Sequence, residues 1–189
     1  MKGFYKGLVA FAFVAAATTS VAQAQGVGFN VGGGVSLPLG NFGDAAKTGF
    51  HGMLGVNFQP ENLPVGIRVD GMYQMYGGSD LFQDLAGDVD FRMISGTANA
   101  VYTFTTAETS TFHPYLIGGV GVYNLGFTGD DADGLDSETK FGVNAGAGFN
   151  FAAGESINLF VEGRFHNVFT EDESTNFIPI SAGVRFGGR

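Results

Sequence analysis

The sequence predicts an all-β fold, an eight-stranded antiparallel up-and-down barrel that crosses a membrane. Three observations predict it. Apolar and polar residues alternate along most of the chain, turn-like segments of unequal length separate eight such stretches, and the first residues resemble an export signal. The composition agrees, because 32 glycines and 20 phenylalanines in 189 residues exceed the usual share in a soluble domain.

The N-terminal segment is organised like a secretory signal peptide. Two lysines precede a short apolar run at 8–17, and residues 22–24 read Ala-Gln-Ala, the small-x-small pattern before a cleavage site. The apolar run is too short to cross a hydrocarbon core of about 30 Å as a helix. We therefore expect residues 1–24 to be removed and residues 25–189 to form one β-barrel domain.

Charge and cysteine content exclude several classes of protein. The sequence has no cysteine, which excludes a disulfide scaffold, a thiolate metal site and a lipid-modified anchor. Cleavage of the signal leaves 7 basic and 18 acidic residues, a net charge of −11. Because no basic stripe is present, a nucleic-acid partner is not expected.

Alternation with a period of two is typical of a strand with two unlike faces. From 141 to 151, each odd position is apolar and each even position is glycine or asparagine. The fourth segment changes parity near Met93-Ile94, which we interpret as a β-bulge. The pattern predicts eight strands, at 26–37, 49–58, 65–76, 89–104, 112–127, 139–151, 156–167 and 176–186.

The connections between these segments alternate in length. Short ones lie at 59–64, 105–111 and 152–155, and longer, more polar ones lie around 38–48, 77–88, 128–138 and 168–175. Short periplasmic turns and longer external loops are typical of outer-membrane barrels. No later segment reaches 18 apolar residues, so an exported chain that stays in the membrane must close a barrel to satisfy its backbone groups.

The two faces of the strands differ in kind. Aromatic residues on the apolar face gather near both strand ends, as bilayer interfaces favour. At the short-turn ends they are Phe29, Phe58, Tyr102, Phe104, Tyr115, Phe149, Phe151 and Phe186. At the long-loop ends they are Phe50, Tyr73, Phe91, Tyr123, Phe141 and Phe165. We therefore expect this face to contact lipid.

The other face carries charged residues of both signs beside glycines, which suits the narrow interior of an eight-stranded barrel. Glu162 and Arg164 are two residues apart and share a face, and the same spacing recurs on two adjacent strands. A catalytic carboxylate or a ligand contact is the alternative, but the repetition favours a structural ion-pair network. Its expected members are Arg68, Asp70, Asp90, Arg92, Glu162, Arg164 and Arg185.

Several strands resemble those of a known family. Residues 114–123 read PYLIGGVGVY, similar to a PYxGxGxGxY strand, and 176–186 read NFIPISAGVRF, similar to a closing strand. The chain thus resembles the outer membrane protein beta-barrel domain family, the small OmpA/OmpX-like barrels. The resemblance implies an outer-membrane location among lipid and lipopolysaccharide, with periplasmic chaperones and the barrel-assembly machinery as partners in biogenesis. One departure is that Phe186, the expected terminal aromatic, is followed by three more residues.

The histidines give little sign of catalysis or metal binding. His51 and His166 are predicted to be lumenal, near the long-loop end, but their strands are not neighbours, so no metal site or cofactor is expected. No serine lies near His166 in the sequence, and the His-x-Ser element of barrel-type lipid A deacylases is missing. We therefore do not expect an enzyme.

The predicted loops are strongly acidic, with 12 of the 18 acidic residues. One loop resembles part of a calcium-binding loop, although Gly129 and Lys140 stand where that pattern requires carboxylates. A solvated acidic rim is one interpretation, and weak divalent-cation binding that bridges to lipopolysaccharide is the other. The expected cation ligands are Asp130, Asp131, Asp133 and Asp136.

Two functions follow from this pattern. The first is a structural or surface-interaction role for a monomer, in which a plugged barrel without an open pore anchors long acidic loops. The alternative is transport of small, apolar solutes across the outer membrane. A lumen lined by large charged residues favours the first, and an open apolar cavity would favour the second.

Overall fold

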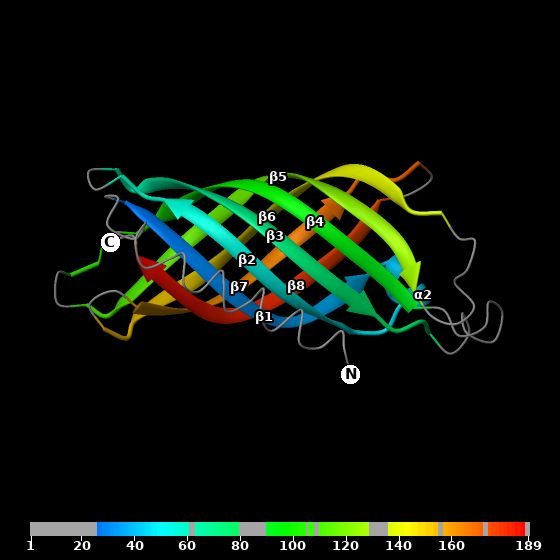
Figure 1. The fold of residues 1–189 in the computed structure, drawn as a ribbon, viewed down its shortest axis with the longest axis horizontal. Helices are drawn as coiled ribbons and strands as arrows, with labels where there is room; N and C mark the ends of the chain where they lie inside the picture. Colours follow the sequence, from blue (N-terminus) through cyan, green and yellow to red (C-terminus); the bar gives the residue numbers. More distant parts are fainter. Residues whose placement is uncertain are drawn as a thin grey trace, which may run out of the picture.

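The computed structural model describes residues 26–60, 63–79, 90–104, 106–107, 110–128, 136–154, 157–171 and 174–187. They form a closed barrel of eight antiparallel strands in chain order (Figure 1). The strands are β1 (Val27–Leu39), β2 (Gly49–Phe58), β3 (Val65–Tyr76), β4 (Asp90–Thr103), β5 (Phe112–Thr128), β6 (Glu138–Ala152), β7 (Ile157–Val168) and β8 (Thr175–Gly187). All eight predicted strands are confirmed, and their ends differ from the prediction by at most two residues.

The barrel closes where β1 pairs with both β2 and β8. Gly34 permits this closure, because a Cβ there would run into the carbonyl oxygen of Ile180 on β8. Closure leaves these strands without an open edge, so backbone groups are bonded within the barrel wall. Among the described residues, no helix is long and apolar enough to cross a membrane.

Burial alternates along the strands in the sense expected for a membrane barrel. β2 alternates between buried and exposed residues over its full length. The exposed positions carry large apolar side chains such as Leu54 and Val56, while Arg68, Asp70 and Glu162 are fully buried inside. A soluble protein would show the reverse arrangement.

A short helix in the first loop was not predicted. β1 continues to Leu39, Gly40 turns the chain with a φ of 58°, and α2 (Asn41–Ala45) follows. Its five residues are too few to show helical periodicity in the sequence. A bridge between Ala46 and Gly78 then joins this loop to the next one. Figure 1 shows α2 at the end of the barrel where the odd-numbered strands finish.

The predicted bulge at Met93-Ile94 is wrong. The pairing of β4 with β3 and with β5 runs without interruption through these residues. The parity of β4 is therefore constant, and Met93 faces inward while Ile94 faces outward. This register decides where Asp90 and Arg92 lie.

Candidate functional site

Four charged side chains form a ring in the middle of the lumen. Arg68 and Asp70 come from β3, and Glu162 and Arg164 come from β7. Arg68 Nε lies 3.0 Å from Asp70 Oδ2, and Arg68 Nη2 lies 2.7 Å from Glu162 Oε1. Arg164 completes the ring, with Nη1 3.1 Å from Asp70 Oδ2 and Nε 2.8 Å from Glu162 Oε1. We call these four residues the charge ring.

Neutral groups add further hydrogen bonds to the charge ring. The hydroxyl of Tyr115 donates to Glu162 Oε2 at 2.7 Å, and Asn99 Nδ2 donates to Asp70 Oδ2 at 3.2 Å. Asn144 Nδ2 then donates to Asn99 Oδ1 at 2.9 Å. Removing charges from water is costly, and pairing with such additional hydrogen bonds is what offsets that cost.

The charge ring also obstructs the lumen. β3 and β7 lie four strands apart in either direction around the barrel, so they face each other across it. Arg68 and Glu162 therefore meet across the full width of the interior, and both are buried. The arrangement fits a closed scaffold rather than a channel.

A second polar cluster, nearer to α2, was not predicted from the sequence. Ser36 Oγ donates to Gln74 Oε1 at 3.0 Å, and Tyr76 donates to the same oxygen at 2.7 Å. Because the Ser36 proton is used there, Ser36 Oγ accepts from His51 Nδ1–H, 3.0 Å away. His51 Nε2 then accepts from the Ser181 hydroxyl, 2.8 Å away. No sequence pattern indicates this cluster, because its members come from four strands.

In this cluster a histidine lies between two serines, as in a serine–histidine catalytic pair, but the carboxylate that usually orients such a histidine is replaced. A catalytic histidine is commonly oriented by a carboxylate, whereas Ser36 orients His51 here. Ser36 and Ser181 are buried in the lumen. His166, the histidine weighed from sequence, instead bonds Tyr123 through Nδ1 at 2.9 Å and stacks on Phe177 at 4.8 Å. Both histidines are therefore buried and hydrogen-bonded to neighbouring strands.

An apolar and aromatic cluster closes the lumen at the α2 end. We call its buried residues the plug, and they are Ala46, Tyr76, Met93, Tyr123, Val168 and Phe177. Phe42 of α2 packs on the plug, with its ring 5.1 Å from that of Tyr76 and 5.8 Å from that of Phe91. The helix therefore covers this mouth of the barrel.

The structure corrects several predicted positions. Because β4 has no bulge, Asp90 and Arg92 lie on the outward side near the α2 end, where Arg92 Nη2 donates to Asn124 Oδ1 at 3.3 Å. They do not join the charge ring. The same parity brings Phe91 inward, and Tyr115 and Tyr123 also face the lumen rather than lipid.

Two other predictions have different outcomes. Arg185 faces the lumen near its other mouth, where Nε donates to Asn30 Oδ1 at 2.9 Å and the guanidinium lies 5.9 Å from the Tyr115 ring centre. The predicted cation loop at Asp130, Asp131 and Asp133 lies outside the described residues, so weak cation binding stays a prediction. Within the described part of the chain, no three acidic or histidine residues are grouped to hold a metal.

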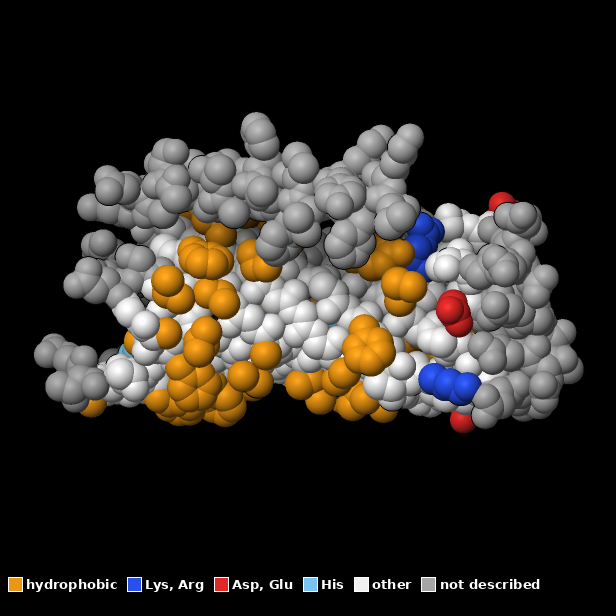
Figure 2. Space-filling model, turned by 60° about the horizontal axis from the view of Figure 1, so that its bottom comes forward, with side chains coloured by type: hydrophobic (Ala, Val, Ile, Leu, Met, Phe, Trp, Pro, Cys, Tyr) orange, Lys and Arg blue, Asp and Glu red, His pale blue; other side chains and the backbone are white. Residues whose placement is uncertain are grey.

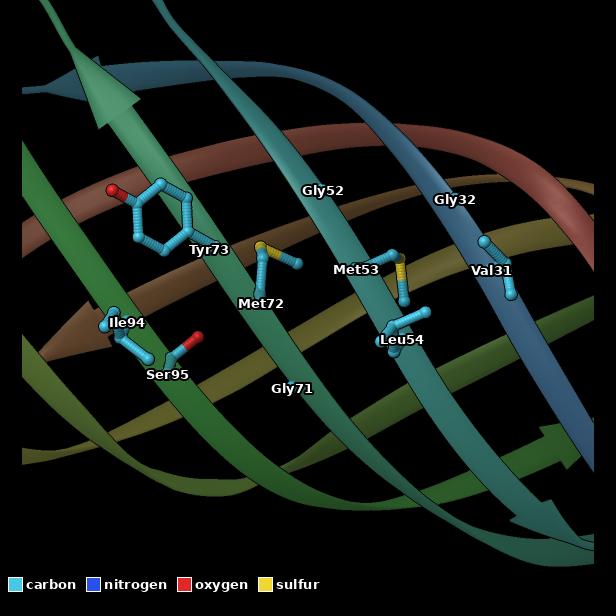
Figure 3. Close-up of a pocket in the computed structure, with 10 residues that line it drawn as sticks. All are labelled: Val31, Gly32, Gly52, Met53, Leu54, Gly71, Met72, Tyr73, Ile94 and Ser95. Carbon is cyan, nitrogen blue, oxygen red and sulfur yellow. The ribbon is translucent and has the colours of Figure 1, made fainter. Parts of the chain in front are cut away.

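On the face of the outer wall that Figure 2 shows, hydrophobic side chains form two bands with a white band between them. The charged side chains visible in that view lie beyond the bands, toward the α2 end. A hollow of about 480 Å³ lies in this wall on β1–β4 (Figure 3). Outward glycines at 52 and 71 form its floor, and Leu54, Tyr73 and Ile94 flank it.

The architecture and the apolar outer wall define a class, the outer-membrane β-barrels. The family model for the outer membrane protein beta-barrel domain matches residues 8–186, and the chain belongs to that family. It is accordingly a protein of the outer membrane, of the Gram-negative type. No curated protein is detectably similar to it.

Solved structures show the same fold at low sequence identity. Neisserial surface protein A matches with a TM-score of 0.67 and 19% identity, over 86% of this chain and 97% of that one. Ail, the attachment invasion locus protein of Yersinia pestis, matches with a TM-score of 0.54 and 19% identity, over 86% and 99%. A major outer membrane protein of Thermus thermophilus matches with a TM-score of 0.56 and 15% identity, over 85% and 98%.

Proposed function

We propose that the protein is a non-enzymatic surface-contact protein, in which the barrel anchors long acidic external loops and passes no solute. The observation that carries this proposal is the filled lumen. The charge ring crosses it at mid-height, and the plug closes it below α2. With the interior occupied by side chains, recognition falls to the loops that the barrel holds at the cell surface.

The transport alternative has less support. The hollow in the wall opens outward, and the buried side chains of Met53, Met72 and Phe160 pack together in the lumen. An apolar solute that enters the hollow would therefore meet packed side chains rather than a path inward. Neisserial surface protein A and Ail carry names that describe surface location and attachment, which agrees with the surface role.

As an outer-membrane barrel, the protein would be surrounded by lipid and would meet the partners that assemble such barrels. Its loops would contact lipopolysaccharide, directly or through divalent cations that relieve repulsion among the loop carboxylates. Periplasmic chaperones and the barrel-assembly machinery would act on the exported chain after its signal at 1–24 is removed. The folded barrel is proposed to work as a monomer.

The test compares loop and lumen variants in cells that lack the native gene. One variant replaces the aspartates at 130, 131, 133 and 136 by asparagine, and the other is Glu162→Gln inside the barrel. We expect the loop variant, but not an equally abundant lumen variant, to reproduce the effect of the deletion on adhesion and on outer-membrane permeability to a hydrophobic dye. If the lumen variant, but not the loop variant, reproduced the effect of the deletion, transport through the barrel would be favoured.

A further inference from the structure

Arg92 carries a positive charge on the outer wall without a counter-charge among the described residues. It faces outward near the α2 end of β4, and it forms no ion pair with another described side chain. Its Nη2 donates to Asn124 Oδ1 at 3.3 Å, but its Nε is buried without a hydrogen-bond partner. Asp90, the carboxylate on the same face, instead accepts from the backbone N–H of Gly78. An unpaired guanidinium at the edge of the hydrocarbon favours an anionic partner.

The neighbouring residues hold this guanidinium against the wall. Gly126 is the cross-strand partner of Arg92 on β5, and a Cβ there would lie 2.7 Å from Arg92 Nη2. The glycine therefore lets the guanidinium lie against β5. Asn124 Nδ2 donates to Thr139 Oγ1 at 3.1 Å, which keeps the amide oxygen of Asn124 toward Arg92. Because the Thr139 oxygen accepts that bond, its hydroxyl proton is available to a ligand beside the guanidinium.

The hollow in the outer wall begins next to Arg92, on the side of the membrane centre. Ile94 lies two residues further along β4 on the same face, and it lines the hollow together with its cross-strand partner Tyr73. Two residues of a strand cover about 7 Å. The hollow has room because Gly52 and Gly71 have no side chain, and a Cβ at either position would meet nothing within 4 Å (Figure 3). A ligand with a charged head and an apolar chain therefore reaches both places at once.

The two parts of this site fit one kind of ligand. The wall faces hydrocarbon, so the hollow suits an acyl chain, and a guanidinium binds phosphate through charge-assisted hydrogen bonds. The site lies at the α2 end, which faces the cell exterior because the short turns join the strands at the other end. We propose that this wall site binds one lipopolysaccharide molecule, with a lipid A phosphate at Arg92 and Thr139 and one acyl chain in the hollow over Gly52 and Gly71.

Lipid binding by the mature barrel in detergent micelles tests this proposal, with native mass spectrometry as the readout. The two probes are lipid A with its phosphates and the same lipid with the phosphates removed. We expect the native protein to bind the phosphorylated lipid about tenfold more tightly, because only that lipid bonds the guanidinium. Equal affinity for the two lipids would overturn the proposal. The acidic loops have no part in this site, so the test can fail while the proposed surface role stands.

A pair of charge variants assigns the phosphate to Arg92. Arg92→Gln should remove the preference for the phosphorylated lipid. Lys140→Gln is the control, since Lys140 is a cation at the same end of the barrel but is already paired with Glu138 and Glu171, each at 3.2 Å. This control should keep the preference. An Arg92→Gln protein that keeps it, or an equal loss in both variants, would show that the phosphate is not held at Arg92.

A pair of glycine variants assigns the acyl chain to the hollow. Gly71→Leu fills the hollow from its floor, so we expect it to weaken the binding of both lipids. Gly163→Leu is the control, because Gly163 faces outward on β7, across the barrel from β3, and a Cβ there also meets nothing within 4 Å. Equal lipid binding by the two folded variants would overturn the assignment of the chain. If Gly71→Leu does not fold, the comparison of Arg92→Gln with Lys140→Gln decides the matter.

Discussion

Glu162 accepts hydrogen bonds from Arg68 and Tyr115 in the lumen and forms an ion pair with Arg164. Glu162→Gln keeps the shape and removes the negative charge, which leaves two buried guanidinium groups facing one carboxylate. Breaking a buried pair in this way costs about 3–5 kcal/mol. We expect a loss of that size in the free energy of unfolding, measured by reversible urea denaturation in lipid vesicles.

Glu138→Gln provides the control for this substitution. Glu138 pairs with Lys140 at 3.2 Å, but its side chain is 63% exposed. Exposed pairs contribute little, so this variant should unfold almost as the native protein does. Equal stability of the two variants would show that the charge ring does not stabilise the barrel.

The sequence predicted which side chains would be polar or charged more reliably than it predicted where each side chain would lie. Arg68, Asp70, Glu162 and Arg164 were expected in the lumen, and the structure brings them together there. Tyr115 was expected to face lipid because it is aromatic. A narrow lumen also accepts large rings, provided that the hydroxyl finds a partner, as Tyr115 does at Glu162. Aromatic character alone therefore does not assign a face.

At the scale of elements, β6 offers a direct test of the two faces. Val143 points outward, whereas its neighbour Asn144 is buried in the lumen. Val143→Arg would place a charge in the hydrocarbon and should destabilise the barrel by about 2–4 kcal/mol in bilayers. Thr139→Arg, outward on the same strand but at its loop end, should cost about 0–1 kcal/mol. Equal effects of the two variants in a lipid unfolding assay would contradict the face assignment.

Phe42 packs the helix α2 against the aromatic residues at the mouth of the barrel. Phe42→Ala removes the ring contacts with Tyr76 and Phe91. We expect faster hydrogen exchange at the amide of Ala46, which bonds Phe42 O, with little change in the unfolding of the barrel. Phe50→Ala serves as the control, since Phe50 lies outward and is 72% exposed. Unchanged exchange in Phe42→Ala would show that the backbone bonds of the loop hold α2 without this ring.

The strands were predictable because most of them keep a clear period of two. β4 misled the prediction because apolar residues occupy both of its faces, with Met93 and Val101 inside and Ile94 and Tyr102 outside. Polarity then no longer marks the face, and a bulge was inferred where pairing is regular. The Ser36–His51–Ser181 cluster was hidden for another reason. Its residues meet only after β1, β2 and β8 close the barrel.

The whole barrel has the reverse of the polarity of a soluble protein. Exposed apolar side chains cover the wall, and charged side chains fill the centre. Such a barrel has its greatest stability in a bilayer, where the wall is satisfied by lipid and the interior by its own pairs. The two obstructions differ in kind, because the charge ring consists of buried ion pairs while the plug is apolar.

This difference leads to a prediction about conduction. The plug leaves no continuous path through the barrel, since Phe177, Tyr123 and Val168 are fully buried across the mouth under α2. An eight-stranded barrel is just wide enough for side chains to fill it, in contrast to the aqueous lumen of porins with about 16–18 strands. We therefore expect the pure protein in planar bilayers to give no large, stable conductance steps, under conditions in which a porin of that size does. Phe177→Ala together with Phe42→Ala should open the mouth under α2 but leave the charge ring in place, so this double variant should also fail to conduct as a porin does. Reproducible large steps from the native protein would mean that the interior opens, and would promote transport over surface contact as its function.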